Sequence, residues 1–217
     1  MSSSPPLIRE GPRLPRPLTF DEFLVQYAGK HAEWHPDGTV EIVVSTQITH
    51  NRITRFLSTL LGLYLGFRPI GELLSAPYPQ QVTSYPAREP DLMVVRDDRR
   101  KSITATALEG PADIVIEVVS PESAERDYSV KYREYEAAGV QEYWLIDADR
   151  RVFDIHERVA DGRYQRRLPD ASQFVTSALL PGFALDPALL WRESLPQGEE
   201  LLALVSGMTG VQIAVRK

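Results

Sequence analysis

Two acidic residues in the middle of the chain have the surroundings of a metal-binding pair. Asp91 follows a proline at the head of the apolar run LMVV, and Glu117 lies inside the apolar run IVIEVV. Both runs are rich in β-branched residues and predict strands, so we expect the two carboxylates on neighbouring strands. Carboxylates near strand ends can hold a hard divalent cation and leave positions for water and a phosphate oxygen. Such a cation activates a bound water and neutralises charge during phosphodiester hydrolysis.

The two acidic residues have different structural alternatives. An aspartate after a proline at the start of a strand is most often a turn residue, so Asp91 alone is a weak signal. Glu117 is harder to explain by structure alone. A carboxylate in a strand covered on both faces is costly unless it is paired, protonated or bound to a metal.

Lys131 is the third candidate for the site. Residues 127–138 predict a helix whose apolar face is built from tyrosines, and Lys131 falls about 60° from the centre of that face. Its ammonium can therefore reach over the strand ends toward Asp91 and Glu117, where it would orient water or bind a phosphate oxygen. The structural alternative is a side chain at the helix edge that pairs with Asp127, four residues earlier.

Length and composition indicate one globular domain with tails. The chain has 217 residues, of which 43% are hydrophobic and 25% charged, as in ordinary globular proteins. Residues 1–18 contain five prolines and three serines and predict a flexible N-terminal arm. We expect the domain to span residues 19–190. Residues 191–217 form a C-terminal extension that is apolar enough to pack on it.

Several classes of protein are excluded or disfavoured by the composition. The chain has no cysteine, which excludes disulfides, zinc-thiolate sites and thiol nucleophiles. No apolar run approaches the roughly 18 residues of a membrane span, so we expect a cytoplasmic protein without a membrane partner. The net charge of −6 disfavours a protein that coats nucleic acid by bulk electrostatics. A cation bound among carboxylates would still make the potential locally positive.

The hydrophobic pattern predicts an α/β order of elements. A short helix begins at Thr19, which forms a capping box with Glu22. The strongest helical periodicity in the chain begins at Thr49 and continues to Tyr64. Short runs rich in valine, isoleucine and aromatic residues predict strands. These runs are Val40–Ser45, Glu72–Thr83, Asp91–Arg96, Ala112–Val119, Glu142–Asp147, Arg151–Glu157 and Arg163–Leu168.

The motifs around these residues resemble a known family. They are PD at 90–91, EVVS at 117–120, an aspartate followed by a lysine four residues on at 127–131, and GVQEYWLID at 139–147. Together they resemble the Uma-type family of proteins described as restriction endonucleases, within the PD-(D/E)XK nuclease superfamily. The resemblance covers roughly Glu33 to Asp186.

This resemblance implies a restriction-endonuclease-like central mixed β-sheet flanked by helices. It implies Mg or Mn bound by Asp91 and Glu117, with the main-chain carbonyl of Val118 as a further ligand. The superfamily lysine stands two residues after the glutamate, where this chain has Val119. Lys131 would supply the lysine from the following helix instead.

Two further residues are weaker candidates for the site. Glu33 lies in the segment EWHPDG, which resembles the family's acidic region, and would be a second carboxylate behind the metal ligands. His50 lies in the first turn of the long helix and would line the cleft. Its structural alternative is a capping or packing residue.

These expectations favour a metal-dependent endonuclease that hydrolyses phosphodiester bonds in DNA. The main alternative keeps the fold without the reaction, as a module that binds nucleic acid or another protein. A hydrolase of smaller phosphate esters is a third possibility. A homodimer would suit cleavage of both strands of a duplex, because it places two related sites on the DNA.

Overall fold

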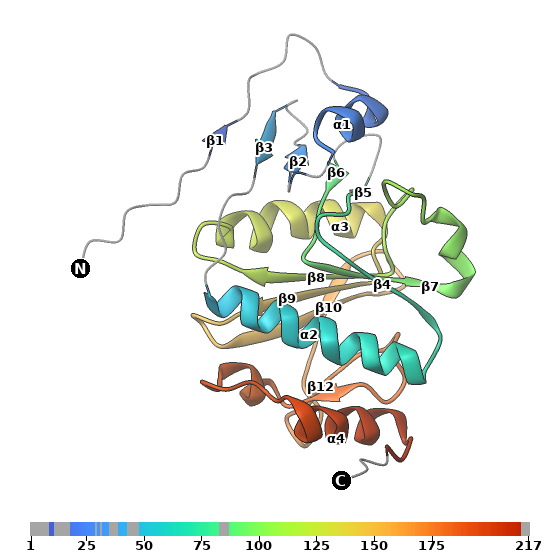
Figure 1. The fold of residues 1–217 in the computed structure, drawn as a ribbon. Coiled ribbons are helices and arrows are strands. Elements are labelled where there is room, and N and C mark those ends of the chain that lie inside the picture. The colour runs from blue at the N-terminus through green and yellow to red at the C-terminus, as the bar shows by residue number, and fades with distance from the viewer. Residues whose placement is uncertain are drawn as a thin grey trace, which may run out of the picture.

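The structure is a computed structural model that describes residues 9–10, 18–28, 30, 32–34, 39–42, 48–82 and 87–213. At its centre is a six-stranded mixed sheet with helices on both faces (Figure 1). The predicted fold class, an α/β domain with a central mixed sheet flanked by helices, is confirmed. None of the helices in the described part of the chain has the length and apolar character that a bilayer span requires.

The central sheet has one parallel pair, β8 with β9, and its other neighbours are antiparallel. Both strands of this pair are buried along their whole length, as their nearly continuous apolar sequences predict for central strands. In sheet order the strands are β11 (Tyr164–Arg167), β10 (Val152–Arg158), β9 (Glu142–Asp147), β8 (Ile114–Val119), β7 (Leu92–Arg96) and β4 (Gly71–Ser75).

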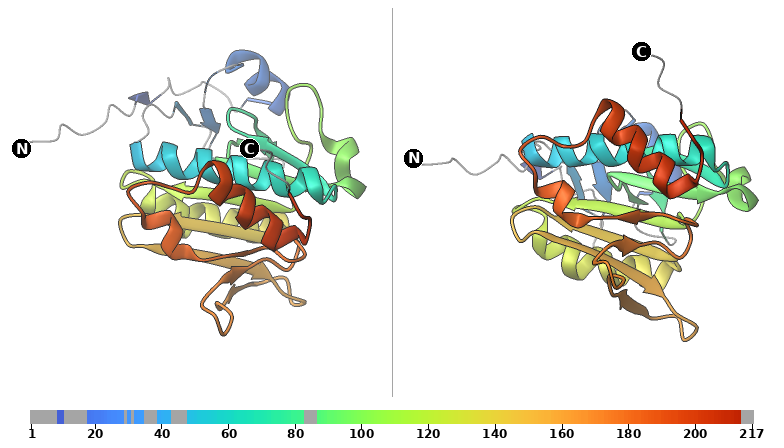
Figure 2. Two further views of the ribbon diagram at one scale, coloured as in Figure 1. Left: turned by 60° about the horizontal axis from the view of Figure 1, so that its bottom comes forward. Right: turned by 90° about the horizontal axis from the view of Figure 1, so that it is seen from below.

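The two faces of the sheet are covered by different helices, as Figure 2 shows. Alternation along β7 sends Leu92 and Val94 to the face covered by α2, and Met93 and Val95 to the face covered by α3. Helix α4 packs against α2. The helices are α2 (Ile48–Phe67), a π-helical turn η2 (Arg126–Lys131) that continues into α3 (Tyr132–Ala138), and α4 (Gly198–Thr209).

A smaller N-terminal unit lies beside α3 and carries its own apolar cluster. Ala32 and Trp34 pack in this cluster, while the alternation of the strand turns Glu33 to the opposite side. The predicted capping box of Thr19 and Glu22 is confirmed. The elements of this unit are β1 (Arg9–Glu10), α1 (Phe20–Gln26), β2 (Ala32–Trp34), β3 (Val40–Ile42), β5 (Gln80–Gln81) and β6 (Ala87–Arg88).

The C-terminal part of the chain closes the α2 face of the sheet. Leu201, Val205 and Met208 of α4 are buried in the same core as α2, so the extension packs on the domain as far as it is described. The remaining elements are η1 (Asp97–Ser102), β12 (Val175–Thr176), β13 (Ala184–Leu185) and η3 (Pro187–Trp191).

The structure corrects the sequence-based boundaries in three places. The single strand predicted over Glu72–Thr83 is wrong, because β4 and β5 belong to different sheets. Pro77 and Pro79 lie between them and lack the N–H that a continuous ladder needs. Strand β2 was not predicted. Within the predicted arm, Arg9–Glu10 pair with β3 and Leu18 is buried, while residues 1–8 and 11–17 lie outside the described part.

The prediction for residues 40–45 is tested only in part. Strand β3 covers the first three of them, and residues 43–47 lie outside the described part of the chain. The long helix α2 agrees with its predicted periodicity. Its buried residues are Ile53, Phe56, Leu57, Leu60, Leu61, Tyr64 and Leu65.

Candidate functional site

Asp91 and Glu117 meet at one edge of the sheet. In the antiparallel ladder of β7 and β8, Leu92 lies opposite Ile116, so the next position of the same register brings Asp91 opposite Glu117. This follows from topology, because the start of one strand meets the end of its antiparallel neighbour. Both residues are buried. The sheet therefore brings together the two carboxylates that the sequence predicted to act as a pair.

The Asp91 carboxylate is held through one of its two oxygens. Oδ2 accepts a hydrogen bond from the Val118 N–H at 2.8 Å and lies 3.1 Å from Nε2 of His50, at the first turn of α2. Burial lowers the pKa of His50, but the hydrogen bond and charge of Asp91 outweigh it and raise that pKa above its usual value. Asp91 Oδ1 makes no hydrogen bond within the described residues.

Glu117 is also held through a single oxygen. Its Oε1 accepts hydrogen bonds from Nζ of Lys131 at 2.9 Å and from the hydroxyl of Tyr135 at 3.0 Å. Burial raises the pKa of Glu117 to about 8; Lys131 opposes this rise, while the nearby charges of Asp127 and Asp91 add to it. Lys131 therefore does not fully offset the effect of burial and of the nearby carboxylates on the pKa of Glu117.

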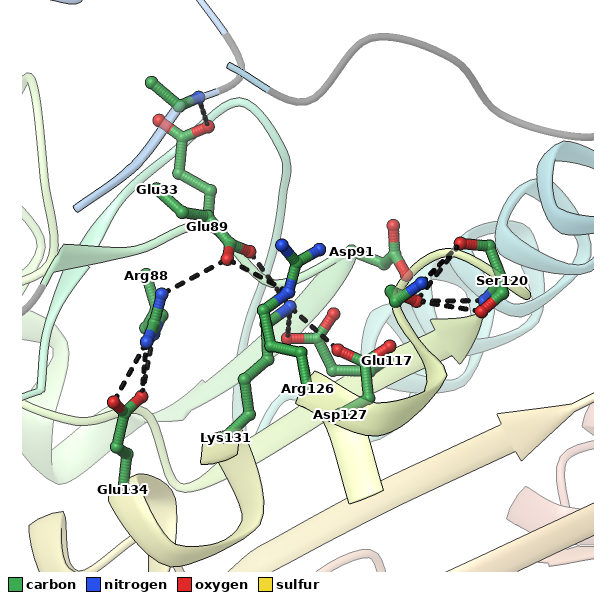
Figure 3. Close-up of polar contacts among 12 residues, drawn as sticks. Glu33, Arg88, Glu89, Asp91, Glu117, Ser120, Arg126, Asp127, Lys131 and Glu134 are labelled. Carbon is green, nitrogen blue, oxygen red and sulfur yellow. Dashed lines mark hydrogen bonds and ion pairs between the residues drawn. The ribbon is translucent and has the colours of Figure 1, made fainter. Parts of the chain in front are cut away.

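Lys131 lies at the centre of the polar cluster drawn in Figure 3. Besides Glu117, its Nζ lies 2.9 Å from Oε1 of Glu33 and 3.2 Å from Oδ1 of Asp127. The wider π-helical turn helps to bring the lysine and Asp127 to the same side of the helix. Burial lowers the pKa of Lys131, but these carboxylates outweigh it and raise that pKa well above its usual value, so the lysine stays protonated.

Glu33 has more cationic partners than Glu117. Arg88 Nη1 donates to its Oε2 at 3.2 Å, Arg126 Nε lies 3.6 Å from the same oxygen, and Lys131 approaches the other oxygen. Burial opposes ionisation, yet the three cations lower the pKa of Glu33 well below its usual value. Arg88, which is fully buried, also makes a two-pronged contact with Glu134 of α3 at 2.8 and 2.9 Å.

Comparison with known proteins places this chain in a family. Residues 19–188 match the Uma2 family, which is described as "Putative restriction endonuclease". The chain belongs to the Uma2 family. The predicted resemblance to this family is thus confirmed over residues 19–188.

A solved structure from Anabaena variabilis ATCC 29413, described as a "putative nuclease belonging to DUF820", is similar to the structure of this chain. The two structures agree with a TM-score of 0.64 at 19% sequence identity, over 81% of this chain and 98% of the other. At this identity the likeness shows a shared fold. No curated protein matches the chain.

The oxygens at the Uma2 site fit a hard divalent cation. Asp91 and Glu117 each keep one oxygen that makes no hydrogen bond within the described residues, and a bound cation would oppose the rise in the pKa of Glu117 that burial and the nearby carboxylates cause. In the described part of the chain no group of three or more acidic or histidine side chains forms a complete metal centre. A cation here would complete its shell with water and substrate oxygens, as Mg does in proteins.

Sequence reasoning named most of the residues that the structure brings together in this candidate site, but it missed two cations. It named Asp127 as the partner of Lys131, and the 3.2 Å contact agrees with that pairing. It placed Tyr135 on the apolar face of the helix without expecting its bond to Glu117. It missed Arg88 and Arg126, whose contacts with Glu33 cross between distant parts of the chain. The only local feature of the sequence that could have indicated a role for Arg88 is its position three residues before Asp91.

Proposed function

We propose that this member of the Uma2 family is a metal-dependent endonuclease that hydrolyses phosphodiester bonds in DNA. The observation that carries the proposal is the pairing of Asp91 with Glu117, opposite each other at the edge of the sheet, each bound through one oxygen only. Membership of a family described as restriction endonucleases supports the same reaction.

Asp91 and Glu117 would hold Mg or Mn through their remaining oxygens. The Val118 N–H and His50 fix the orientation of the Asp91 carboxylate, which places Oδ1 without help from the substrate. The main-chain carbonyl of Val118 is the further ligand that the resemblance implies. When bound, the cation supplies an activated water and stabilises charge on the phosphate.

Lys131 acts in this proposal as a fixed positive charge, because its raised pKa keeps it protonated and unable to accept a proton. Glu117 and Val119 lie on the same face of β8, and Lys131 reaches the Glu117 carboxylate from the helix that covers that face. The ammonium thereby orients Glu117 and adds positive charge beside the phosphate. This geometry explains how a lysine on the helix can replace one at position 119.

Cleavage assays with matched variants test the proposal. Plasmid DNA and short single-stranded and duplex DNA are incubated with wild type, Asp91→Asn and Asp113→Asn, with Mg, Mn or EDTA. Asp113 is the control, because it is a buried aspartate before the opposite end of β8, where it accepts a hydrogen bond from the Arg96 N–H at 2.9 Å. We expect metal-dependent cleavage that falls by roughly 10²-fold or more in Asp91→Asn, the scale of losing one preorganised charged group.

The outcomes separate the nuclease from its alternatives. Cleavage that needs a metal and Asp91, and that survives in Asp113→Asn, supports the endonuclease. DNA binding without cleavage by wild type contradicts it and favours a module that has lost the reaction. Hydrolysis of small phosphodiesters without cleavage of DNA favours a different substrate class.

A further inference from the structure

A groove runs along the N-terminal half of α2, outside the carboxylate site. Its other wall is the segment from 190 to 198, which lies beside this half of the helix in Figures 1 and 2. Two hollows of about 460 and 330 Å³ share Arg52, Glu193 and Leu195, so they form one continuous groove. We call it the arginine groove, after its four arginines, Arg52, Arg55, Arg151 and Arg192.

Positive charge is in excess in the arginine groove. The side chains of Arg52, Arg55 and Arg151 are exposed and make no ion pair with the acidic residues of the described part of the chain. Arg192 is paired with Glu200 at 2.7 Å, and Glu193 is the one acidic residue among those that line the groove. Three unpaired arginines therefore face one carboxylate.

Most arginines elsewhere in the described structure differ from Arg52, Arg55 and Arg151 of the groove. They lie within ion-pair distance of a carboxylate of the same chain, so their charge is balanced internally. This set is Arg88, Arg96, Arg99, Arg100, Arg126, Arg150, Arg163, Arg166 and Arg167. In a chain with a net charge of −6, the arginine groove is thus a local exception that is available to an external anion.

The spacing of the arginines suits a repeated anion. Arg52 and Arg55 are three residues apart on α2, which separates them by about 4.5 Å along the helix axis. Residues three apart lie on the same side of a helix, so both guanidinium groups can contact phosphates of one DNA strand. Guanidinium groups bind phosphate oxygens in a two-pronged geometry and stay charged at all physiological pH values.

The groove and the carboxylate site share one helix. His50, at the first turn of α2, contacts Asp91, and Arg52 lies two residues further on. Because a helix with its side chains is about 10 Å across, a strand that passes the end of α2 can contact both sides. We propose that the arginine groove binds the sugar-phosphate backbone of DNA outside the scissile phosphate. The identity of this DNA as substrate rests on the proposed nuclease function.

A binding experiment with two charge-matched double variants tests this inference. Arg52→Gln/Arg55→Gln removes two charges from the groove. Lys101→Gln/Arg133→Gln removes two charges from exposed residues of η1 and α3, which likewise have no carboxylate partner in the described structure. Fluorescence anisotropy measures binding of a labelled duplex of roughly 20 base pairs, about two helical turns. EDTA prevents cleavage, and the salt concentration runs from about 50 to 200 mM.

We expect the groove variant to bind DNA roughly tenfold or more weakly than wild type at about 100 mM salt. The slope of the logarithm of the binding constant against the logarithm of the salt concentration should also become less steep by nearly 2, because each lost phosphate contact contributes about 0.9. The control variant should bind like wild type. A thermal unfolding midpoint equal to that of wild type would show that both variants fold. Equal affinities and salt slopes for the two variants would overturn the groove assignment.

Cleavage kinetics separate a failure of the groove from a failure of the nuclease. With Mg or Mn, the groove variant should raise KM and leave kcat nearly unchanged, because its arginines act away from the scissile bond. If wild type cleaves DNA and the two variants have the same KM, the proposed role of the groove is overturned and the proposed nuclease function is not affected. If wild type binds DNA through the groove arginines but does not cleave it, the proposed nuclease function is overturned. The groove would then bind DNA that is not a substrate.

Discussion

Two buried glutamates on adjacent central strands, Glu142 and Glu117, have contrasting environments. Glu142 begins β9, and its carboxylate accepts hydrogen bonds from Trp144 Nε1 at 2.8 Å, Ser177 Oγ at 2.8 Å and the Ala178 N–H at 2.6 Å. The Leu179 N–H adds a longer bond of 3.2 Å. All these donors are neutral, and both oxygens are used. Glu142 therefore joins β9 to the segment at 177–179 as a closed structural network.

Glu117 lies toward the other end of the adjacent strand β8, and its hydrogen bonding is incomplete. Both of its donors use Oε1, and one of them is the cation Lys131. Burial raises the pKa of Glu117, and the three carboxylates of Asp127, Asp91 and Glu33 add to this rise. Burial alone therefore does not separate a functional carboxylate from a structural one. The difference lies in the partners, because neutral donors bind both oxygens of Glu142, whereas Glu117 keeps one oxygen without a hydrogen bond in the described structure.

Removal of Lys131 should have the largest effect on stability and would show how strongly Glu117 depends on a cation. Lys131→Met leaves the buried carboxylates of Glu33, Glu117 and Asp127 without their shared partner. We expect the free energy of unfolding to fall by about 3–5 kcal/mol, the usual cost of breaking a buried ion pair. Urea denaturation measures this loss, with the exposed Lys101→Met as the control. A loss below about 1 kcal/mol would contradict the structural account of the cluster.

Glu142→Gln should destabilise the fold without affecting the reaction. The amide NH₂ would face donors that now bind a carboxylate oxygen, so we expect a loss of about 2 kcal/mol in the free energy of unfolding. Metal-dependent cleavage should stay close to wild type under conditions where the variant is folded. A strong loss of cleavage by the folded variant would contradict the purely structural role assigned to Glu142.

The pH dependence of stability should distinguish the same pair. The pKa of Glu117 is raised from 4.5 to about 8 in the folded chain, so its stabilising contribution is fully present below pH 4.5 and is lost as the pH rises to about 8. In EDTA, Glu117→Gln should flatten this decline by up to about 1.4 kcal/mol per pH unit. Unfolding curves between these pH values measure the slope. An unchanged slope in Glu117→Gln would contradict the raised pKa.

Removal of the Tyr135 hydroxyl should have the smallest effect. Tyr135→Phe keeps the buried ring and deletes one hydrogen bond to Oε1 of Glu117, while Lys131 still holds that oxygen. We expect a loss of about 1 kcal/mol in the free energy of unfolding, the typical net value of one hydrogen bond. Tyr128→Phe is a matched control in the same helical segment, since its hydroxyl donates to Asp147 at 3.1 Å instead. Only the first variant should shift the pH slope assigned to Glu117.

Local patterns were sufficient to predict the elements that carry the site. The apolar run around Glu117 and the periodicity of α2 predicted a central strand and a long helix, because each pattern reports burial along one element. The same reasoning failed between residues 72 and 83. There each half of the run has strand composition, but the prolines between them decide that the halves join different sheets.

The partners inside the site were less predictable than its elements. The spacing of Asp127 and Lys131 on one helical segment was readable from the sequence, and the structure brings the two together. The contact of Arg88 with Glu33 joins β6 to β2. The periodicity of a sequence describes one element at a time, so it could not predict a contact between two strands whose neighbours were unknown. The network around Glu142 was not predicted either, because its donors Ser177 and Ala178 lie 35 and 36 residues away in the chain.

Calorimetric titration of Mn into the metal-free chain addresses the shared cation at Asp91 and Glu117. Wild type and the control Asp113→Asn should bind the cation with similar heats. Asp91→Asn and Glu117→Gln should each lose that binding, because each keeps the fold of the site but removes one anionic ligand. Binding that persists unchanged in both variants, or wild type that binds no cation, would contradict the account.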